Sequence, residues 1–299
     1  MTDEEWLDER TVDVTIDSPA MGTGQPVRLI VPPGWDTETD AARTWPVLYL
    51  LHGGRDDYTS WTRETDVAEL SARNQVIIAM PEGGRAGNYS DWYNYGRGGA
   101  PRWETFHLEE VWQVLRDRYG AGERRAVAGI SSGGYGAVIY AARNPGMFTA
   151  AASYSGLLTP RTELSWTLLK AVMRNEGLDP YAMWGFPGLH EDVWRAHDPV
   201  AQAEGLRGTD LYLSSGTTGR PGDLDGDQGY GNSLGLGEAM CGSSLQTMRR
   251  VLDLHDIPAT VHLYRRGTHS WPYWQRELHT SWPMLMDSLG AEDTHPEQA

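Results

Sequence analysis

The chain has 299 residues, enough for one large α/β domain or two smaller ones. Its 41 acidic side chains outnumber its 25 basic ones, and the formal charge of −16 argues against nucleic acid, whose binding needs clustered cations. The same charge would be repelled by an anionic membrane surface, and no stretch approaches the ~18 apolar residues of a membrane span. We therefore expect a globular protein that neither binds nucleic acid nor inserts stably into a membrane.

Cys241 is the only cysteine, so no disulfide can form within the chain, and we expect this residue to pack inside a helix. The first residues, Met-Thr-Asp-Glu-Glu-Trp, are acidic and lack the basic and apolar regions of a signal peptide. From these residues alone we expect either a protein that stays inside the cell or a chain without its leader.

The first third of the chain alternates strand and helix patterns. Residues 11–17 and 26–31 alternate in hydrophobicity and predict an antiparallel pair at the edge of a sheet. Residues 46–51 are continuously apolar, which is typical of a strand buried on both faces. A helix at 61–74 and a second buried strand at 76–80 follow.

A long loop at 83–103, rich in aromatic side chains and glycine, leads into an amphipathic helix at 104–119. The remaining predicted elements are a strand at 126–130, a helix at 137–143, a strand at 149–154, an inserted helical and loop region at 156–207, a strand at 210–215, a glycine- and aspartate-rich loop at 219–236, a helix at 238–255, a strand at 259–264 and a helix at 273–289. This order predicts a mostly parallel central sheet flanked by helices, with right-handed crossovers. With no repeat and no linker, we expect a single domain over residues 1–299.

Between the strand at 126–130 and the helix at 137–143 lies Gly129-Ile-Ser131-Ser-Gly133. This pattern, G-x-S-x-G, is typical of a sharp strand-to-helix turn that lifts a serine hydroxyl above a sheet. The simpler alternative is a glycine-rich helix start with serine as its cap. The strand before the motif and the small-residue helix after it favour Ser131 as a nucleophile.

A nucleophilic serine needs a base and an acid, which the loops at the carboxyl ends of parallel strands supply. His269 follows the last predicted strand and is the candidate base; the alternative is a histidine on a surface loop. Four carboxylates follow the strand at 210–215: Asp223, Asp225, Asp227 and Glu238. Their position alone does not separate them, and three aspartates among glycines also fit a solvated loop. The order serine, acid, histidine is that of the α/β-hydrolase fold.

The backbone N–H of Ser132, directly after the candidate nucleophile, is one expected donor to the oxyanion of the reaction. The loop after the strand at 46–51 should supply the other, and Gly54 of His52-Gly-Gly54 is the natural choice. Residues 223–227 faintly resemble the start of a calcium loop. The sixth position of such a loop would not be glycine here, and Leu234 stands where the final Glu should be, so we expect no metal. No dinucleotide-binding glycine motif follows a strand, and we expect no cofactor.

Several stretches together resemble the antigen 85 mycolyltransferases, within the wider group of esterase D-like serine esterases. The matching stretches are residues 18–22, 49–61, 80–84, 89–93, 103–106, 182–185 and 267–274. The last, Gly-Thr-His-Ser-Trp-Pro-Tyr-Trp, is the most distinctive, because ordinary esterases share the serine motif but not this aromatic run around the histidine. The resemblance implies Ser131 as nucleophile, His269 as base and Glu238 as acid, since the family's acid is a Glu at a helix start upstream of the histidine.

The resemblance also implies a substrate site. Arg55, Trp61 and Trp271 would contact a sugar, and His52 stands where the family usually has a sugar-binding Asp. The implied reaction moves a long, mycolyl-type acyl chain from a glycolipid ester, through an acyl-serine intermediate, to trehalose or a similar glycoside. The resemblance further implies a protein that is secreted or associated with the cell wall, and we expect this protein to be a monomer. The alternatives are a carboxylesterase whose acceptor is water and a non-catalytic protein that binds cell wall or matrix.

Overall fold

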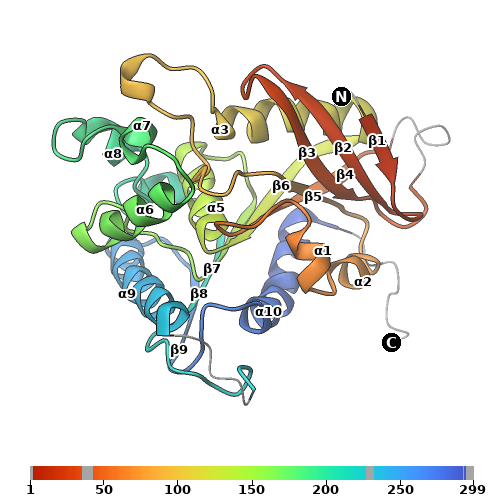
Figure 1. Cartoon of the computed structure of the whole chain (residues 1–299). Helices are drawn as coiled ribbons and strands as arrows, with labels where there is room; N and C mark the ends of the chain where they lie inside the picture. Colours follow the sequence, from red (N-terminus) through yellow and green to blue (C-terminus); the bar gives the residue numbers. More distant parts are fainter. Residues whose placement is uncertain (1–2, 36–42, 227–231, 292, 294–299) are drawn as a thin grey trace.

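The computed structural model describes residues 3–35, 43–226, 232–291 and 293. Its strands form one sheet in the order β1-β2-β3-β5-β4-β6-β7-β8-β9 (Figure 1). Their bounds are β1 Asp3–Trp6, β2 Thr11–Ser18, β3 Thr23–Ile30, β4 Trp45–Leu51, β5 Ile77–Pro81, β6 Ala121–Ile130, β7 Ala150–Tyr154, β8 Asp210–Gly216 and β9 Thr260–Tyr264. From β5 to β9 all neighbours are parallel, while β1, β2, β3 and β5 pair antiparallel. The predicted mostly parallel sheet with an antiparallel edge is confirmed.

Strand β1 is the one element of the sheet that the sequence did not predict. Its four residues, Asp-Glu-Glu-Trp, are all exposed, so the strand has no buried face and no alternation of hydrophobicity to reveal it. It is held by backbone pairing with β2, in a register that sets Asp3 against Thr15 and Trp6 against Val12.

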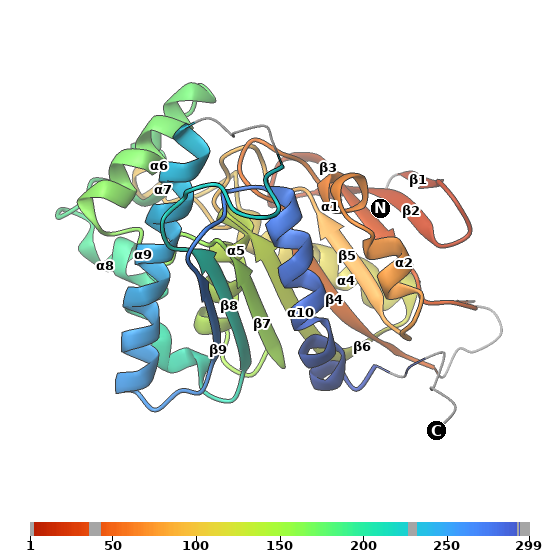
Figure 2. The same cartoon turned by 90° about the horizontal axis from the view of Figure 1, so that it is seen from below.

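Helices cover both faces of the sheet, and alternating side chains of the same strands feed the two cores. On one face, Tyr49 and Leu51 of β4 pack with α4 (Trp112–Tyr119), α5 (Ser132–Arg143) and α9 (Asn232–Leu254). On the other face, Leu48 and Leu50 pack with α1 (Ser60–Glu64), α2 (Val67–Ser71) and α10 (Trp271–Leu289). Figure 2 shows α10 running across this second face while α9 lies on the opposite side of the sheet.

Several helices differ from the prediction. The helix predicted at 61–74 is two short helices, α1 and α2, because Thr65 between them is extended and ends α1. The helix predicted at 104–119 is continuous from α3 (Trp103–Thr105) through α4, with one π-helical segment, η2 (Phe106–Val111). Helix α9 begins at Asn232, six residues before the prediction, so Glu238 lies in its second turn.

The inserted region at 156–207 contains helices, as predicted: α6 (Glu163–Asn175), α7 (Pro180–Trp184), α8 (Glu191–Ala196) and η3 (Ala203–Leu206). In Figure 1, α6, α7 and α8 gather at one side of the sheet, away from β1 to β3. The loop at 83–103 is mostly irregular, with a short turn, η1 (Asn94–Gly96). Among the described residues, no helix is long and apolar enough to cross a membrane.

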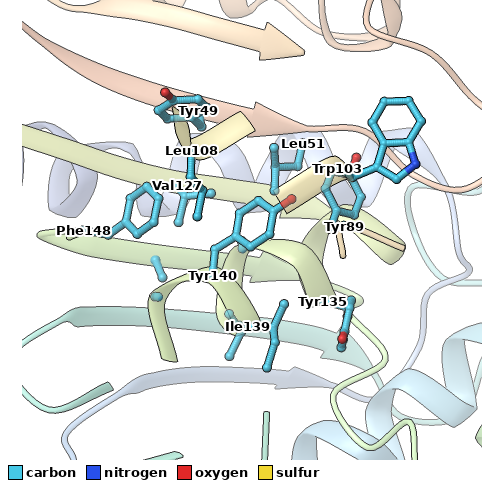
Figure 3. Close-up of a cluster of buried hydrophobic side chains, with 14 of the residues drawn as sticks. Tyr49, Leu51, Tyr89, Trp103, Leu108, Val127, Tyr135, Ile139, Tyr140 and Phe148 are labelled. Atoms are coloured by element: carbon cyan, nitrogen blue, oxygen red, sulfur yellow. The ribbon is translucent and has the colours of Figure 1, made fainter. Parts of the chain in front are cut away.

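Residues 133–142 of helix α5 are all buried, and the glycines among them allow neighbouring segments to approach the helix closely. Figure 3 shows Tyr135, Ile139 and Tyr140 of this helix gathered with Tyr89 in one buried cluster. A Cβ on Gly136 would lie 2.5 Å from the Tyr89 ring, so glycine is required for this approach. The phenol of Tyr89 in turn donates a hydrogen bond of 2.7 Å to the carbonyl of His52, which ties α5 to the loop after β4.

Candidate active site

Ser131 sits in a strained turn between β6 and α5. Its φ is 52° and its ψ is −118°, a left-handed conformation that costs energy for a residue with a side chain. A Cβ on Gly129 would lie 2.2 Å from the Gly133 carbonyl oxygen, and a Cβ on Gly133 would lie 2.2 Å from that of Leu51. The glycines of the G-x-S-x-G motif are therefore needed for backbone contact, which is how this sequence forms the turn.

The structure joins Ser131, His269 and Glu238 in one chain of hydrogen bonds. The distance from Ser131 Oγ to His269 Nε2 is 2.9 Å, and that from His269 Nδ1 to Glu238 Oε2 is 2.8 Å. The three residues come from the turn after β6, the loop after β9 and helix α9, and they meet at the carboxyl edge of the sheet. With Nδ1–H donated to the carboxylate, Nε2 is free to accept the serine proton.

The carboxylate of Glu238 is fully buried and its second oxygen is saturated with donors. Oε1 accepts hydrogen bonds from Ser155 Oγ at 2.9 Å, Ser215 Oγ at 3.1 Å and Tyr264 OH at 3.0 Å, and from the Gly216 N–H. These donors offset the desolvation of a buried charge and leave Oε2 for the histidine. Burial and the neighbouring carboxylate raise the pKa of Tyr264, which keeps its phenol a donor at neutral pH.

Two backbone N–H groups close to Ser131, those of Ser132 and Gly54, have no hydrogen-bond acceptor in the described part of the chain. Ser132 is the first residue of α5, so its N–H has no acceptor within the helix. The loop carrying Gly53 and Gly54 lies against it: a Cβ on Gly54 would be 3.7 Å from Ser132 Oγ, and one on Gly53 would be 3.5 Å from Ser131 Cβ. The N–H of Gly54 makes no hydrogen bond within the described part of the chain.

A cavity of about 1160 Å³ opens over this serine and histidine. The residues that line it are Gly53, Gly54, Arg55, Asp56, Glu64, Arg85, Ile130, Ser131, Leu224, His269, Ser270, Trp271, Pro272, Trp274, Gln275, Arg276, His279 and Thr280. Its walls are therefore the loop after β4 on one side and the first turns of α10 on the other, with both aromatic faces and charged groups available to a ligand.

Two of the four residues predicted to contact substrate line this cavity. Arg55 is exposed and Trp271 is partly buried, and both belong to the wall. Trp61 and His52 do not: Trp61 is fully buried and packs edge-on against Trp271, 5.4 Å between ring centres. Trp61 supports the Trp271 ring from behind and has no surface left for a sugar.

His52 is a correction to the predicted substrate contacts. Its side chain is 1% exposed and both ring nitrogens are used internally. Nδ1 donates to the carbonyl of Gly53 at 2.7 Å, and Nε2 accepts from the N–H of Gly83 at 2.8 Å. The imidazole points into the protein, where it fixes the oxyanion loop against the loop after β5, and it cannot touch a ligand in the cavity.

The competing acids are separated by the structure. Asp223 is exposed and has no partner in the described residues, while Asp225 is buried but bonds Thr268 and Tyr273 and not the histidine. Asp227 lies outside the described residues. Cys241 lies one turn beyond Glu238 in α9, as a packed residue whose thiol pKa is raised by burial and then by Glu238, so it remains a neutral thiol.

Sequence reasoning missed the residues that support Glu238. Ser155 follows β7, Ser215 is the last residue but one of β8 and Tyr264 ends β9, so they are far apart in the sequence and none stands in a motif. The only available signal was that polar side chains recur at the carboxyl ends of consecutive parallel strands, where sites form.

Comparison with known proteins identifies the family of the chain. The sequence model of the Esterase family matches residues 18–285. The chain is 33% identical over 256 residues to the diacylglycerol acyltransferase/mycolyltransferase Ag85A of Mycobacterium ulcerans, covering 82% of this chain and 74% of the relative. It is 35% identical over 209 residues to an esterase of Mycobacterium tuberculosis, covering 68% of this chain and 45% of that protein.

Among solved structures, the crystal structure of Mycobacterium tuberculosis MPT51 superposes with a TM-score of 0.71 at 24% identity, covering 92% of this chain and 97% of the other. This likeness concerns the fold, and it agrees with a helix-flanked, mostly parallel sheet of the α/β-hydrolase type. The family match over most of the chain and the identity to mycolyltransferases concern the sequence itself. The chain belongs to the esterase family, among its antigen 85-type members.

Proposed function

We propose that this protein is an acyltransferase that works through an acyl ester of Ser131, with His269 as general base and Glu238 as the supporting acid. The observation that carries the proposal is the pair of hydrogen bonds, 2.9 Å and 2.8 Å long, that joins these three side chains, of which Ser131 and His269 line a large cavity. A merely structural serine has no need of a base and a buried carboxylate in this order. These two hydrogen bonds also argue against the alternative of a non-catalytic binding protein.

In the first half of the reaction, Ser131 Oγ attacks the carbonyl carbon of an acyl ester while His269 Nε2 takes its proton. The negative charge on the carbonyl oxygen is stabilised by the N–H groups of Gly54 and Ser132. Glu238 stabilises the imidazolium, and because it is buried its charge acts at short range without competition from water. The tetrahedral intermediate then expels the alcohol, which takes the proton from Nε2 and leaves an acyl-serine.

In the second half, His269 Nε2 takes a proton from an acceptor hydroxyl, whose oxygen attacks the carbonyl carbon of the acyl-serine. The tetrahedral intermediate then breaks its bond to Ser131 Oγ, which takes the proton back from Nε2 as the new ester leaves. The acceptor decides whether the protein is a transferase or a hydrolase. Water is abundant, so transfer needs a bound alcohol held in a reactive position, where its effective concentration is high. Arg55 and Trp271 in the cavity wall provide a planar cation and an aromatic face for such an alcohol.

We propose that the acceptor is trehalose or a similar glycoside and that the acyl group is long. Support comes from the relative whose name states mycolyl transfer and from the size and mixed lining of the cavity. The second candidate, hydrolysis of acyl esters by water, is favoured by one observation: only two of the four residues predicted to contact a sugar reach the cavity. The relative named as an esterase is consistent with either. The predicted secreted or cell-wall location and the predicted monomer remain predictions.

The deciding experiment is product analysis with an acyl-trehalose donor, with and without added free sugar. Diacyl-trehalose, or labelled acyl-trehalose when the free sugar carries the label, is the expected product. Ser131→Ala is the control and should form neither. If free fatty acid is the sole product at saturating sugar, the protein is a hydrolase and the transferase assignment is wrong.

A further inference from the structure

The segment 217–225, which leaves the end of β8, runs beside residues 264–273 and is bonded to them along its length. The N–H of Thr217 donates to the carbonyl of Tyr264 at 2.8 Å, and the Thr218 hydroxyl donates to the carbonyl of Arg265 at 2.5 Å. The N–H of Gly267 donates to the carbonyl of Arg220 at 2.8 Å. The loop that follows the strand carrying Ser215 is thus attached to the loop that carries His269.

Asp225 ends this set of contacts as a buried carboxylate. It is 4% exposed, and Oδ2 accepts hydrogen bonds from Tyr273 OH at 2.7 Å and from the Gly222 N–H at 2.6 Å. Oδ1 accepts from the hydroxyl of Thr268. In the described part of the chain no cation pairs with this carboxylate, so these three donors alone offset the loss of water around its charge.

The partners of Asp225 are next to the proposed catalytic residues. Thr268 is buried and directly precedes His269 in a loop, between the end of β9 and the start of α10, that has no regular structure of its own. Tyr273 is fully buried, and its ring stacks on that of Tyr264 with 5.5 Å between centres and 8° between planes. Tyr264 is the residue whose phenol bonds Glu238.

We propose that Asp225 is a positioning residue that holds His269 in line with Ser131, acting through Thr268 and Tyr273. The proposal rests on the function proposed above. A histidine on an irregular loop must be held within a fraction of an ångström to accept a proton efficiently. A buried carboxylate that accepts three hydrogen bonds from this loop and its neighbours supplies that rigidity. Asp225 itself does not line the cavity, although its neighbour Leu224 does. Its effect should therefore appear in turnover and not in substrate binding.

The test measures kcat and KM for a small soluble ester, the rate at which a fluorophosphonate labels Ser131, and the thermal midpoint of unfolding. Asp225→Asn should lower kcat and the labelling rate by about 10- to 100-fold, the scale expected for a slightly misplaced catalytic group, with KM unchanged within about twofold. Asn keeps the shape but replaces one acceptor oxygen with an N–H₂ donor that faces hydroxyl donors.

Asp223→Asn is the matched control, because it removes the same charge two residues away, on an exposed side chain without hydrogen-bond or ion-pair partners in the described residues. If Asp225→Asn does not fold, variants of Thr268 provide a second test of the proposal. Thr268→Val removes the bond to Asp225, together with the contact of 3.1 Å between the hydroxyls of Thr268 and Ser270, and should lower kcat. Thr268→Ser retains the hydroxyl and should restore kcat. A thermal midpoint that falls in Asp225→Asn and Thr268→Val while kcat per folded molecule stays at the parent value would overturn the proposal.

The outcome is separable from that of the proposed function. If Ser131→Ala keeps its ester-cleaving activity, the assignment of the nucleophile is wrong whatever the Asp225 variants do. If Ser131→Ala is inactive while Asp225→Asn and Thr268→Val retain full kcat, the nucleophile assignment stands and Asp225 serves only the fold.

Discussion

Tyr264 and Glu238 are joined by a hydrogen bond of 3.0 Å to Oε1, the carboxylate oxygen that His269 does not use. Glu238 therefore binds the histidine with one oxygen while strand ends hold the other. Because the two carboxylate oxygens have separate partners, a glutamate on a helix can be aligned with a histidine on an irregular loop.

We predict that Glu238→Gln lowers kcat severely, by roughly 10⁴, the scale seen when the acid of a related triad is made an amide. The amide cannot stabilise the imidazolium and presents a donor where Nδ1–H also donates. Steady-state kinetics on a soluble ester measure the effect. Asp223→Asn serves as the control of equal charge change, and a severe Asp223→Asn beside a mild Glu238→Gln would reverse our assignment.

Tyr264→Phe should be much milder, because three donors to Oε1 remain. Loss of one hydrogen bond to a charged group corresponds to about 1.5–3 kcal/mol if it were felt entirely in the transition state, and the remaining donors reduce that. We expect kcat to fall by about three- to tenfold at unchanged KM. An effect as large as that of Glu238→Gln would mean that Tyr264 takes part in proton transfer itself.

The nucleophile is tested by labelling. A serine-directed fluorophosphonate should modify Ser131 and abolish ester cleavage, and peptide mass spectrometry locates the label. Ser131→Ala should lose activity on the order of a million-fold, as when members of a triad act as one unit. Ser132 is the internal control, since it lies next to Ser131 and also has a hydroxyl; a label found there contradicts the turn geometry described above.

The sequence predicted those parts of the site that depend on local pattern. Ser131 and His269 were identified because a glycine-rich turn and the end of the last strand are readable from neighbouring residues. Position in the sequence alone does not separate Glu238 from the three aspartates, and only the family resemblance favours it. In the structure it is held by Ser155, Ser215 and Tyr264, which only tertiary packing brings together. Asp225 was read as one of a set of aspartates because burial cannot be read from a polar loop.

Arg55 and Arg85 hold each other at the cavity mouth. The Arg55 N–H donates to the Arg85 carbonyl at 2.7 Å, and Arg85 Nη1 donates to the Arg55 carbonyl at 3.0 Å. Glu176, at the end of α6, accepts from both guanidinium groups, and chiefly the hydrogen bond from Arg85 holds the pKa of its carboxyl below the usual value. The inserted region is thus connected to the loop that carries Gly54, the residue we propose as an oxyanion donor.

We predict that Arg85→Lys lowers kcat by about three- to tenfold, because one ammonium cannot reproduce the forked contacts to Glu176 and the Arg55 carbonyl, so Gly54 is held less rigidly. Glu176→Gln should be milder, since exposed ion pairs contribute little by themselves. Kinetics with a short ester, which does not reach the far end of the cavity, isolate the oxyanion effect. A change in KM alone for Arg85→Lys would indicate a substrate contact instead.

His107 should make stability depend on pH. It is fully buried, with Nδ1 bonded to Tyr140 OH at 2.7 Å and Nε2 to the Glu82 carbonyl at 2.8 Å, an arrangement that satisfies the neutral ring. Burial lowers its pKa from 6.5 to about 4. As the pH falls below 6.5, His107 is protonated in the unfolded chain but stays neutral in the folded protein. The free energy of unfolding therefore decreases progressively down to about pH 4, by up to about 3 kcal/mol.

Urea unfolding at pH 7.5, 6.5 and 5.5 measures this slope before most carboxylates titrate. In His107→Gln the slope should flatten, even though the variant is less stable at pH 7.5 because its hydrogen bonds are imperfect. His255→Gln, on an exposed side chain, is the control and should keep the parent slope. An equally steep slope in His107→Gln would assign the pH dependence to other groups.

The last prediction concerns His52, where the family usually has a sugar-binding Asp. If the histidine faced the cavity, His52→Asp would be expected to strengthen transfer to a sugar. The structure leads to the opposite expectation. The new carboxylate would be buried at a site 1% exposed, near Glu82, whose Oε1 lies 3.7 Å from His52 Nε2, and the Gly83 N–H would lose its acceptor at 2.8 Å.

Burial of an uncompensated charge beside a like charge is among the most destabilising of single changes. We therefore expect His52→Asp to lower the thermal midpoint by several degrees and to reduce both transfer and hydrolysis, because Gly53 and Gly54 lose their support. His52→Asn, which is neutral and retains a donor for the Gly53 carbonyl, should lie between the parent and His52→Asp. The ratio of transferred to hydrolysed product decides the matter: a rise in that ratio for His52→Asp, in a folded protein, would show that the side chain at this position reaches the acceptor after all.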